Sequence, residues 1–197
     1  MKSIQKIAFV LFTSLALMSC SDEDPILNED DSGLCDESTS EFQSLFQTMI
    51  NDGYEDKLFI DTEIHEYSFT LSADKEVCKI GYQSLPGIET TPYLIEIIDS
   101  SSNTTLYSDS HVFLSNNTSY VIPSTTINLA AGIPYTIKRV QTDWGMYITN
   151  TIGRVARQDS MKFPYTNGVI TITNSNFFQN GGPLLNVAIP YIDLILR

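Results

Sequence analysis

One stretch of the chain has residue types that suit the binding of a sugar. Asp143-Trp144-Gly145-Met146-Tyr147 contains the single tryptophan of the sequence, beside a glycine in an expected loop. An exposed aromatic ring there can stack on a sugar ring, while Asp143 or Arg139 bonds the sugar hydroxyls. Large aromatic side chains are usually highly buried, so the alternative is that Trp144 fills one end of a hydrophobic core. The candidate ligand site is therefore Trp144, Tyr147, Asp143 and Arg139.

Patterns for catalysis and metal binding are weak. The chain has two histidines, His65 and His111, and no serine in a glycine-flanked elbow. It also lacks zinc-type cysteine pairs, the HExxH pattern and an EF-hand loop. The sequence therefore predicts no catalytic residue, no metal and no cofactor, and it favours a protein that is not an enzyme. Glycoside hydrolysis stays open, because its two carboxylates can lie far apart in a chain.

The negative charge is concentrated in the N-terminal third. Between Ser21 and Glu66 there are 15 acidic residues and one basic residue, whereas Tyr67 to Arg197 holds 9 acidic and 8 basic residues. No long basic stretch is present, so nucleic-acid binding is not expected. Lys138-Arg139 with Arg154 and Arg157 is a candidate basic patch for an acidic glycan, or else ordinary solvated charge.

The first twenty residues have the layout of an export signal. Two lysines within Met1 to Lys6 precede the apolar run Ile7 to Leu17, which is too short to span a bilayer. The ending Leu17-Met18-Ser19-Cys20 resembles the lipobox of bacterial lipoproteins, which implies removal of residues 1–19 and a lipid on Cys20. The alternative is an ordinary signal peptide in which Cys20 is accidental. Without residues 1–19, 178 of the 197 residues remain.

Ser21, Asp22, Glu23 and Asp24 follow the lipid-bearing cysteine directly. They resemble the acidic export run of surface lipoproteins of the Bacteroidetes, which implies attachment to the outer membrane, facing outside the cell. Physically, residues 20–37 are an acidic, solvated tether that keeps a domain away from a negative membrane surface. The alternative is that the run is only a tether.

Residues 38–51 are expected to form one short amphipathic helix. Phe42, Leu45, Phe46, Met49 and Ile50 recur at helical spacing and share one face. Ser38 with Glu41 forms a capping box, and Gly53 suits the end of the helix. A helix this short must dock its apolar face on the domain that follows.

From Tyr67 the apolar period changes to two, the period of strands with one buried face. The expected strands and their core positions are Tyr67 to Leu71, Cys78 to Tyr82, Tyr93 to Ile97, Val112 to Leu114, Tyr120 to Ile122, Tyr135 to Ile137, Val169 to Thr173 and Tyr191 to Leu196. Turn-forming residues separate them. The sequence therefore predicts an all-β, antiparallel β-sandwich or jelly roll, with the helix, over residues 38–197.

The order of these pieces resembles small jelly-roll domains with a galactose-binding-like fold from secreted bacterial proteins. The matching pieces are Ile80-Gly81-Tyr82, Tyr93 to Asp99 with Leu106-Tyr107, Leu129 to Ile137, and Tyr191-Ile192-Asp193-Leu194. The resemblance implies a fold rather than a function.

Two features concern modification. Cys35 and Cys78 remain as a pair if Cys20 carries lipid, so they form either a disulfide or two separate thiols. Asp159-Ser160-Met161 resembles the O-glycosylation triplet of the Bacteroidetes, which implies Ser160 as the acceptor.

Two functional classes follow. The first is a lipid-anchored module that binds a glycan or another surface ligand. The second is a structural, assembly or adhesion component that binds protein partners. Exposed aromatic residues near Trp144 favour the first class, and a large apolar patch or a long open edge strand favours the second.

Overall fold

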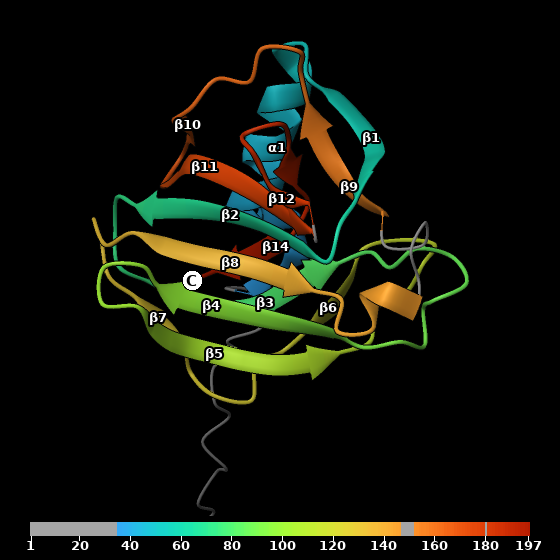
Figure 1. Cartoon of the computed structure of the whole chain (residues 1–197). Helices are drawn as coiled ribbons and strands as arrows, with labels where there is room; N and C mark the ends of the chain where they lie inside the picture. Colours follow the sequence, from blue (N-terminus) through green and yellow to red (C-terminus); the bar gives the residue numbers. More distant parts are fainter. Residues whose placement is uncertain (1–34, 147–151, 180) are drawn as a thin grey trace, which may run out of the picture. The chain divides into compact units, whose positions relative to one another are not determined.

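The computed structural model describes residues 35–146, 152–179 and 181–197, which belong to one compact unit by their contacts. They form an antiparallel all-β sandwich with an α-helix at the start, as the sequence predicts (Figure 1). The helices are η2 (Glu37–Thr39), α1 (Glu41–Asn51) and η3 (Trp144–Met146). The strands are β1 (Glu55–Asp61), β2 (Ile64–Leu71), β3 (Lys75–Tyr82), β4 (Tyr93–Asp99), β5 (Thr104–His111), β6 (Ser119–Val121), β7 (Asn128–Leu129), β8 (Tyr135–Val140), β9 (Ile152–Arg157), β10 (Tyr165–Asn167), β11 (Ile170–Gln179), β12 (Gly182–Leu185), β13 (Ile189–Pro190) and β14 (Asp193–Leu196).

A seven-stranded sheet forms one layer of the sandwich. Its strands lie in the order β10-β11-β2-β8-β4-β5. The seventh strand, β12, pairs with β11 on the side away from β2. Burial alternates along β2, β4 and β8, so every second side chain faces the core. Tyr67 and Phe69 on β2 and Ile95 and Ile97 on β4 are fully buried, which confirms the predicted period of two.

The opposing layer contains a smaller sheet in the order β14-β3-β6, with β7 pairing with β3. Its inward residues include Ile80, Tyr82 and Leu194, which join the same core cluster as the inner face of the large sheet. In Figure 1 the strands β2, β8, β4 and β5 lie in front of β3 and β14. A third sheet, β1-β9-β13, completes the described fold.

Helix α1 occupies the part of the second layer beside β14. Phe42, Leu45, Phe46 and Met49 are buried, which confirms the predicted apolar face. The Phe42 ring stacks on Tyr67 with centroids 5.3 Å apart, and Phe46 meets Tyr191 edge-on at 4.8 Å. Full burial of such side chains is worth roughly 1.5–3 kcal/mol each, so docking holds this eleven-residue helix more than propensity does.

The start of the helix differs from the prediction. Ser40, not Ser38, is the N-cap, and its hydroxyl accepts a hydrogen bond from the Gln43 backbone N–H at 3.0 Å. Ser38 lies instead in the 3₁₀ turn η2, which Asp36 caps. The helix ends as expected, because Gly53 adopts φ +93°, a conformation that glycine reaches without strain.

The Asp193 carboxylate joins α1 to the second sheet. It is fully buried and accepts hydrogen bonds from the Ser40 hydroxyl, the Gln43 side-chain amide at 2.7 Å and the Tyr120 hydroxyl at 2.7 Å. Burial raises the pKa of this carboxyl, while the three donors act in the opposite direction. Gly81 lies between Asp193 and Tyr120 in the sheet register, and a Cβ there would come within 2.5 Å of the Tyr120 ring.

The residues before α1 cross the outer side of β3. Cys35 is joined to Cys78 by a disulfide, with Cα atoms 5.7 Å apart and a sequence separation of 43. Lys79 forms an ion pair with Glu37 at 3.0 Å. A disulfide that closes a loop of this length typically stabilises a small domain by roughly 2–4 kcal/mol.

One predicted strand is wrong, and two further strands were not predicted. Val112 to Leu114 is not a strand, because β5 ends at His111 and only Phe113 of the three turns into the core. Strands β1 and β9 were not predicted, since Glu55–Asp61 and Ile152–Arg157 have few apolar residues with a clear period of two. Pairing with each other and with β13 defines them.

Replacing Asp193 tests whether this carboxylate holds α1 in place. Asp193→Ala leaves three donors without their shared acceptor in a buried site, so we expect a loss of roughly 2–4 kcal/mol in the free energy of unfolding. Urea denaturation of the wild type and the variant measures it. Asp159→Ala, at an exposed position, is the matched control and should change stability by less than about 0.5 kcal/mol. Equal losses in both variants would contradict the role of Asp193.

Candidate functional site

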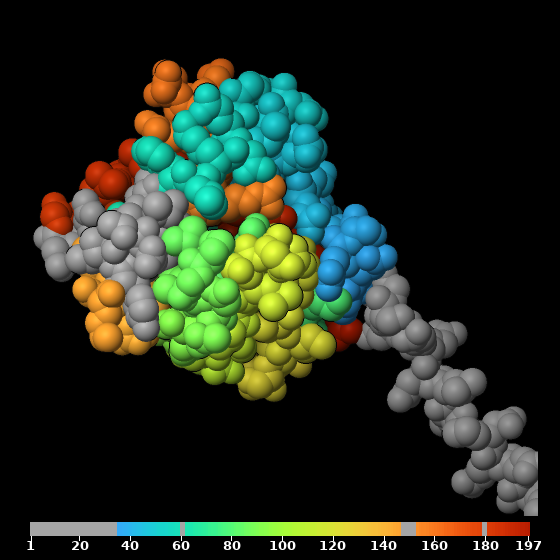
Figure 2. Space-filling view, turned by 90° about the vertical axis from the view of Figure 1, so that its right-hand side faces the viewer, coloured from blue at the N-terminus to red at the C-terminus, as the bar shows by residue number. Residues whose placement is uncertain are grey.

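Trp144 lies at the surface end of β8 and is partly buried. It begins η3, its backbone N–H donates to the Gln141 carbonyl at 3.1 Å, and it does not belong to the described core clusters. Asp143 is exposed, and Met146 is 80% exposed. Figure 2 shows this end of the domain, with η3 among the orange atoms at the left margin. Trp144 therefore neither fills the hydrophobic core nor presents a fully exposed ring.

The predicted contribution of Arg139 to this site is wrong. Arg139 is fully buried, and its Nη1 donates to the carbonyl oxygens of Thr62 at 3.4 Å and Glu63 at 3.2 Å. Its guanidinium lies over the rings of Tyr82 and Tyr93, 5.6 and 5.3 Å from their centroids. Alternation along β8 turns Arg139 inward with Tyr135 and Ile137, so it cannot reach a ligand beside Asp143.

The candidate basic patch does not form either. Lys138 and Arg139 face opposite sides of β8, and Arg154 and Arg157 belong to β9 in the third sheet. Arg154 makes two hydrogen bonds to the Asp56 carboxylate, at 2.9 and 2.7 Å, and stacks over Tyr191 at 4.2 Å. These charges bind elements of the fold together.

Of the remaining predicted positions, only Ser160 lies among the described residues. Tyr147, Cys20 and the run Ser21, Asp22, Glu23 and Asp24 lie outside the described residues. Ser160 is exposed beside a polar hollow lined by Glu55, Lys57 and Arg157, so its role as a glycosylation acceptor stays a prediction.

The two histidines have packing roles. His65 is buried edge-on against Phe177, with centroids 4.8 Å apart. His111 ends β5 and stacks on Tyr107, whose hydroxyl lies 2.5 Å from its Nε2 atom. Burial lowers the pKa of His111 and so favours its neutral form. Within the described residues no group of three or more His, Cys, Asp or Glu side chains is placed to hold a metal ion.

A row of polar side chains crosses the outer face of the seven-stranded sheet. The register aligns Asn176 on β11, Glu66 on β2, Lys138 on β8, Glu96 on β4 and Ser108 on β5. The Asn176 amide donates to Glu66 at 2.8 Å, Lys138 Nζ lies 2.8 Å from Glu96, and the Ser108 hydroxyl donates to Glu96 at 3.4 Å. We call this set the polar row.

An apolar row runs parallel to the polar row and is displaced from it by two residues on every strand, later in sequence on β11, β8 and β5 and earlier on β2 and β4. It aligns Phe178, Ile64, Val140 and Leu94 and ends at Ser110 on the edge strand. All four apolar side chains are partly exposed. Strand β8 continues from Val140 towards η3, so Trp144 lies at the same end of the sheet as the apolar row. Figure 1 shows this face from the front, with no described helix or strand crossing it between β2 and β5.

The electrostatics of the polar row are nearly balanced. Burial raises the pKa of Glu66, and the Asn176 hydrogen bond and the Lys138 charge oppose this rise. Lys138 is paired with Glu96, and both side chains are about one-fifth exposed. The row therefore offers both donors and acceptors to a ligand without a strong field of either sign.

Sequence reasoning missed these two rows. In the sequence, the polar residues of β2 and β8 alternate with apolar ones. This alternation predicts that they point away from the core. Their alignment into rows depends on which strands pair and in what register, and a single sequence does not contain that information.

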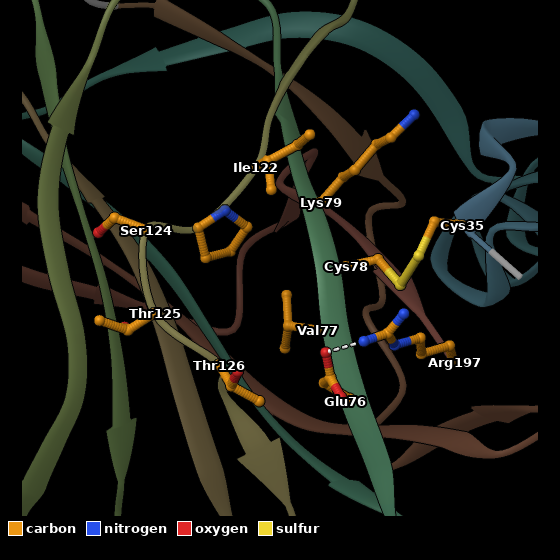
Figure 3. A pocket seen from close by; sticks show the side chains of 11 residues that line it. Cys35, Glu76, Val77, Cys78, Lys79, Ile122, Ser124, Thr125, Thr126 and Arg197 are labelled. Atoms are coloured by element: carbon orange, nitrogen blue, oxygen red, sulfur yellow. Dashed lines mark hydrogen bonds and ion pairs between the residues drawn. A yellow bond between two sulfur atoms is a disulfide. The ribbon is translucent and has the colours of Figure 1, made fainter. Parts of the chain in front are cut away.

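A separate hollow of about 260 Å³ lies on the outer side of the second sheet, along β3 (Figure 3). Val77 lies between the loop after β6, which forms one wall, and the Cys35–Cys78 disulfide. The residues that line it are Cys35, Glu76, Val77, Cys78, Lys79, Ile122, Pro123, Ser124, Thr125, Thr126 and Arg197.

The sequence matches no protein-family model and no curated protein. No helix among the described residues is long and apolar enough to cross a bilayer.

Proposed function

We propose that this protein is a lipid-anchored, non-enzymatic module that binds a neutral glycan on the outer face of its seven-stranded sheet. The observation that carries the proposal is the pair of parallel rows, polar and apolar, on one open face. The lipid on Cys20 and the acidic tether would present this face outside the cell.

Sugars are amphipathic, and the two rows are matched to that property. Same-face residues on one strand are about 7 Å apart, and neighbouring strands are about 4.8 Å apart. The C–H face of a sugar ring can therefore rest on Val140 and Leu94 while its hydroxyls reach Lys138 and Glu96. Trp144, at the same end of the sheet as the apolar row, adds an aromatic surface for stacking.

A neutral glycan fits this face better than an acidic one. The polar row has two carboxylates, Glu66 and Glu96, and one cation, Lys138, which is already paired. Asp143 adds a further negative charge beside Trp144. Since Arg139 faces the core, no arginine in the polar row is available to pair with a uronate or sulfate.

The same two carboxylates do not make a convincing hydrolase site. Glycoside hydrolases place two carboxyl groups on either side of one bond, about 5–10 Å apart. Lys138 stands between Glu66 and Glu96 in the register and binds Glu96. The row also lies on a sheet face rather than in the described hollows, so nothing there encloses a reacting bond. The outer face therefore suits binding of a glycan better than its hydrolysis.

A protein partner is the second candidate. Strand β5 is the edge of the large sheet and is eight residues long, with mostly exposed side chains. An open edge presents unpaired backbone groups to which another strand can add. Polar residues such as Thr104, Ser108 and Asp109 cover this edge, and charged or polar edges usually discourage such pairing. The open edge of β5 is therefore weaker support for a protein partner than the two rows are for a glycan.

Binding to immobilised glycans tests the outer face. The wild type is expected to retain at least one neutral polysaccharide from a panel of glucans, mannans, xylans and galactans. Lys138→Met should weaken retention about tenfold or more, because a hydrogen bond to a charged group is worth about 1.5–3 kcal/mol. Trp144→Ala should also weaken it, while costing less than about 2 kcal/mol of stability, since the ring is only partly buried.

The controls are matched by residue type. Lys162→Met removes an exposed lysine away from the face, and Leu58→Ala removes an exposed apolar side chain from the third sheet. Both should retain the glycan as the wild type does. No retention of any panel member, or equal retention by Lys138→Met and the wild type, would overturn the proposal. Release of reducing sugar from the retained glycan would argue for an enzyme instead.

The lipid anchor needs its own test. Cys20→Ser removes the thiol to which the lipid would be attached, so labelling with a radioactive fatty acid should disappear and the protein should leave the membrane fraction. Cys35→Ser is the control, because it removes a different cysteine. Continued fatty-acid labelling of Cys20→Ser would show that the lipobox interpretation is wrong.

A further inference from the structure

We propose that the hollow along β3 is a second binding site, which takes a neutral, polyhydroxylated ligand about the size of a sugar ring. It lies on the sheet opposite the seven-stranded sheet, so it does not depend on the outer face. Its volume of about 260 Å³ is near the lower end of the range for small-molecule sites.

The walls of the hollow combine hydroxyl groups with apolar surface. The loop after β6 contributes Ser124, Thr125 and Thr126 to the lining, three consecutive residues that carry hydroxyl groups. Ile122 is 75% exposed on the same loop, and Pro123 follows it. Hydroxyls can donate to and accept from sugar hydroxyls, and Ile122 can cover a C–H face.

The charges around the hollow are already matched. Lys79 is paired with Glu37 at 3.0 Å, and Arg197 with Glu76 at 2.6 Å. An anionic ligand would have to compete with these carboxylates, whereas a neutral ligand can accept from the cations without breaking either pair. The charge pattern therefore favours an uncharged polyol over a phosphate or uronate.

The hollow continues along the same strand. A second hollow, of about 480 Å³, is lined by Asp74, Lys75 and Asn128 among others. It shares Glu76 and Arg197 with the first, so their ion pair separates two spaces that follow each other along β3. A disaccharide can place one ring in each space. We therefore expect disaccharides to bind more tightly than single sugars.

The disulfide gives this site its shape. Cys35 lines the hollow, and its bond to Cys78 holds the segment that carries Glu37 beside Lys79. The lining of the hollow thus combines Cys35 with residues 122–126, which are far apart from it in sequence. In Figure 3, Cys35 and the loop 122–126 lie on opposite sides of the β3 ribbon.

Ligand-observed NMR tests the site with defined probes: glucose, galactose, mannose, N-acetylglucosamine, their common disaccharides, and glucuronate. Saturation transfer to at least one neutral sugar is expected, and a weaker transfer to glucuronate. Thr125→Trp fills the hollow from an exposed position and should abolish the transfer. Ser102→Trp, in an exposed turn, is the matched control and should leave it unchanged.

The outcomes separate this site from the outer face. The triple change Ser124→Ala, Thr125→Val and Thr126→Val keeps the approximate shape and should weaken the transfer at least fivefold, whereas Lys138→Met should not affect it. Loss of transfer in Lys138→Met with full transfer in Thr125→Trp would overturn this inference and leave the proposed function standing. Transfer to none of the neutral sugars would also overturn it, even if the outer face retains a polysaccharide. Melting temperatures equal to that of the wild type confirm that the variants fold.

Discussion

The buried Asp193 carboxylate is the interaction on which the arrangement of the layers depends. It joins the N-cap of α1, the Gln43 amide and the Tyr120 hydroxyl, which come from the helix and from β6, to β14. A buried carboxylate is costly unless its lone pairs are satisfied, so these elements must meet in one geometry. Gly81 makes that geometry possible, because only a glycine leaves room for the Tyr120 ring.

This geometry leaves the two sheets with different surfaces. The segment from Cys35 to Gln43 crosses the outer side of the second sheet and is fixed there by the disulfide, the Lys79–Glu37 pair and Asp193. What remains open on that side is a hollow along β3. The seven-stranded sheet has no such cover between β2 and β5 in Figure 1, so its outer side chains form a broad face. An extended ligand therefore fits the large sheet, and a small one fits the hollow.

Much of the fold was predictable because burial imposes a period on the sequence. The apolar stripe of α1 and the alternation in β2, β4 and β8 followed directly from residue types. The N-cap is Ser40 rather than the predicted Ser38, because the Ser40 hydroxyl also donates a hydrogen bond to the distant Asp193 carboxylate. The charge of Arg139 favours a role in the site, whereas its spacing of two residues from Ile137 indicates that it faces the core, where the structure has it. The rows of the outer face depend on register between distant strands, which the sequence alone does not specify.

The most direct test of the outer face as the binding surface is methyl NMR during titration with a soluble neutral oligosaccharide that the protein retains. We predict that the methyl signals of Ile64, Leu94 and Val140 shift in a saturable manner, because these side chains form the apolar row. The methyl signals of Leu58, on the third sheet, should stay unchanged. Saturable shifts that leave Ile64, Leu94 and Val140 unaffected would contradict the assignment of this face.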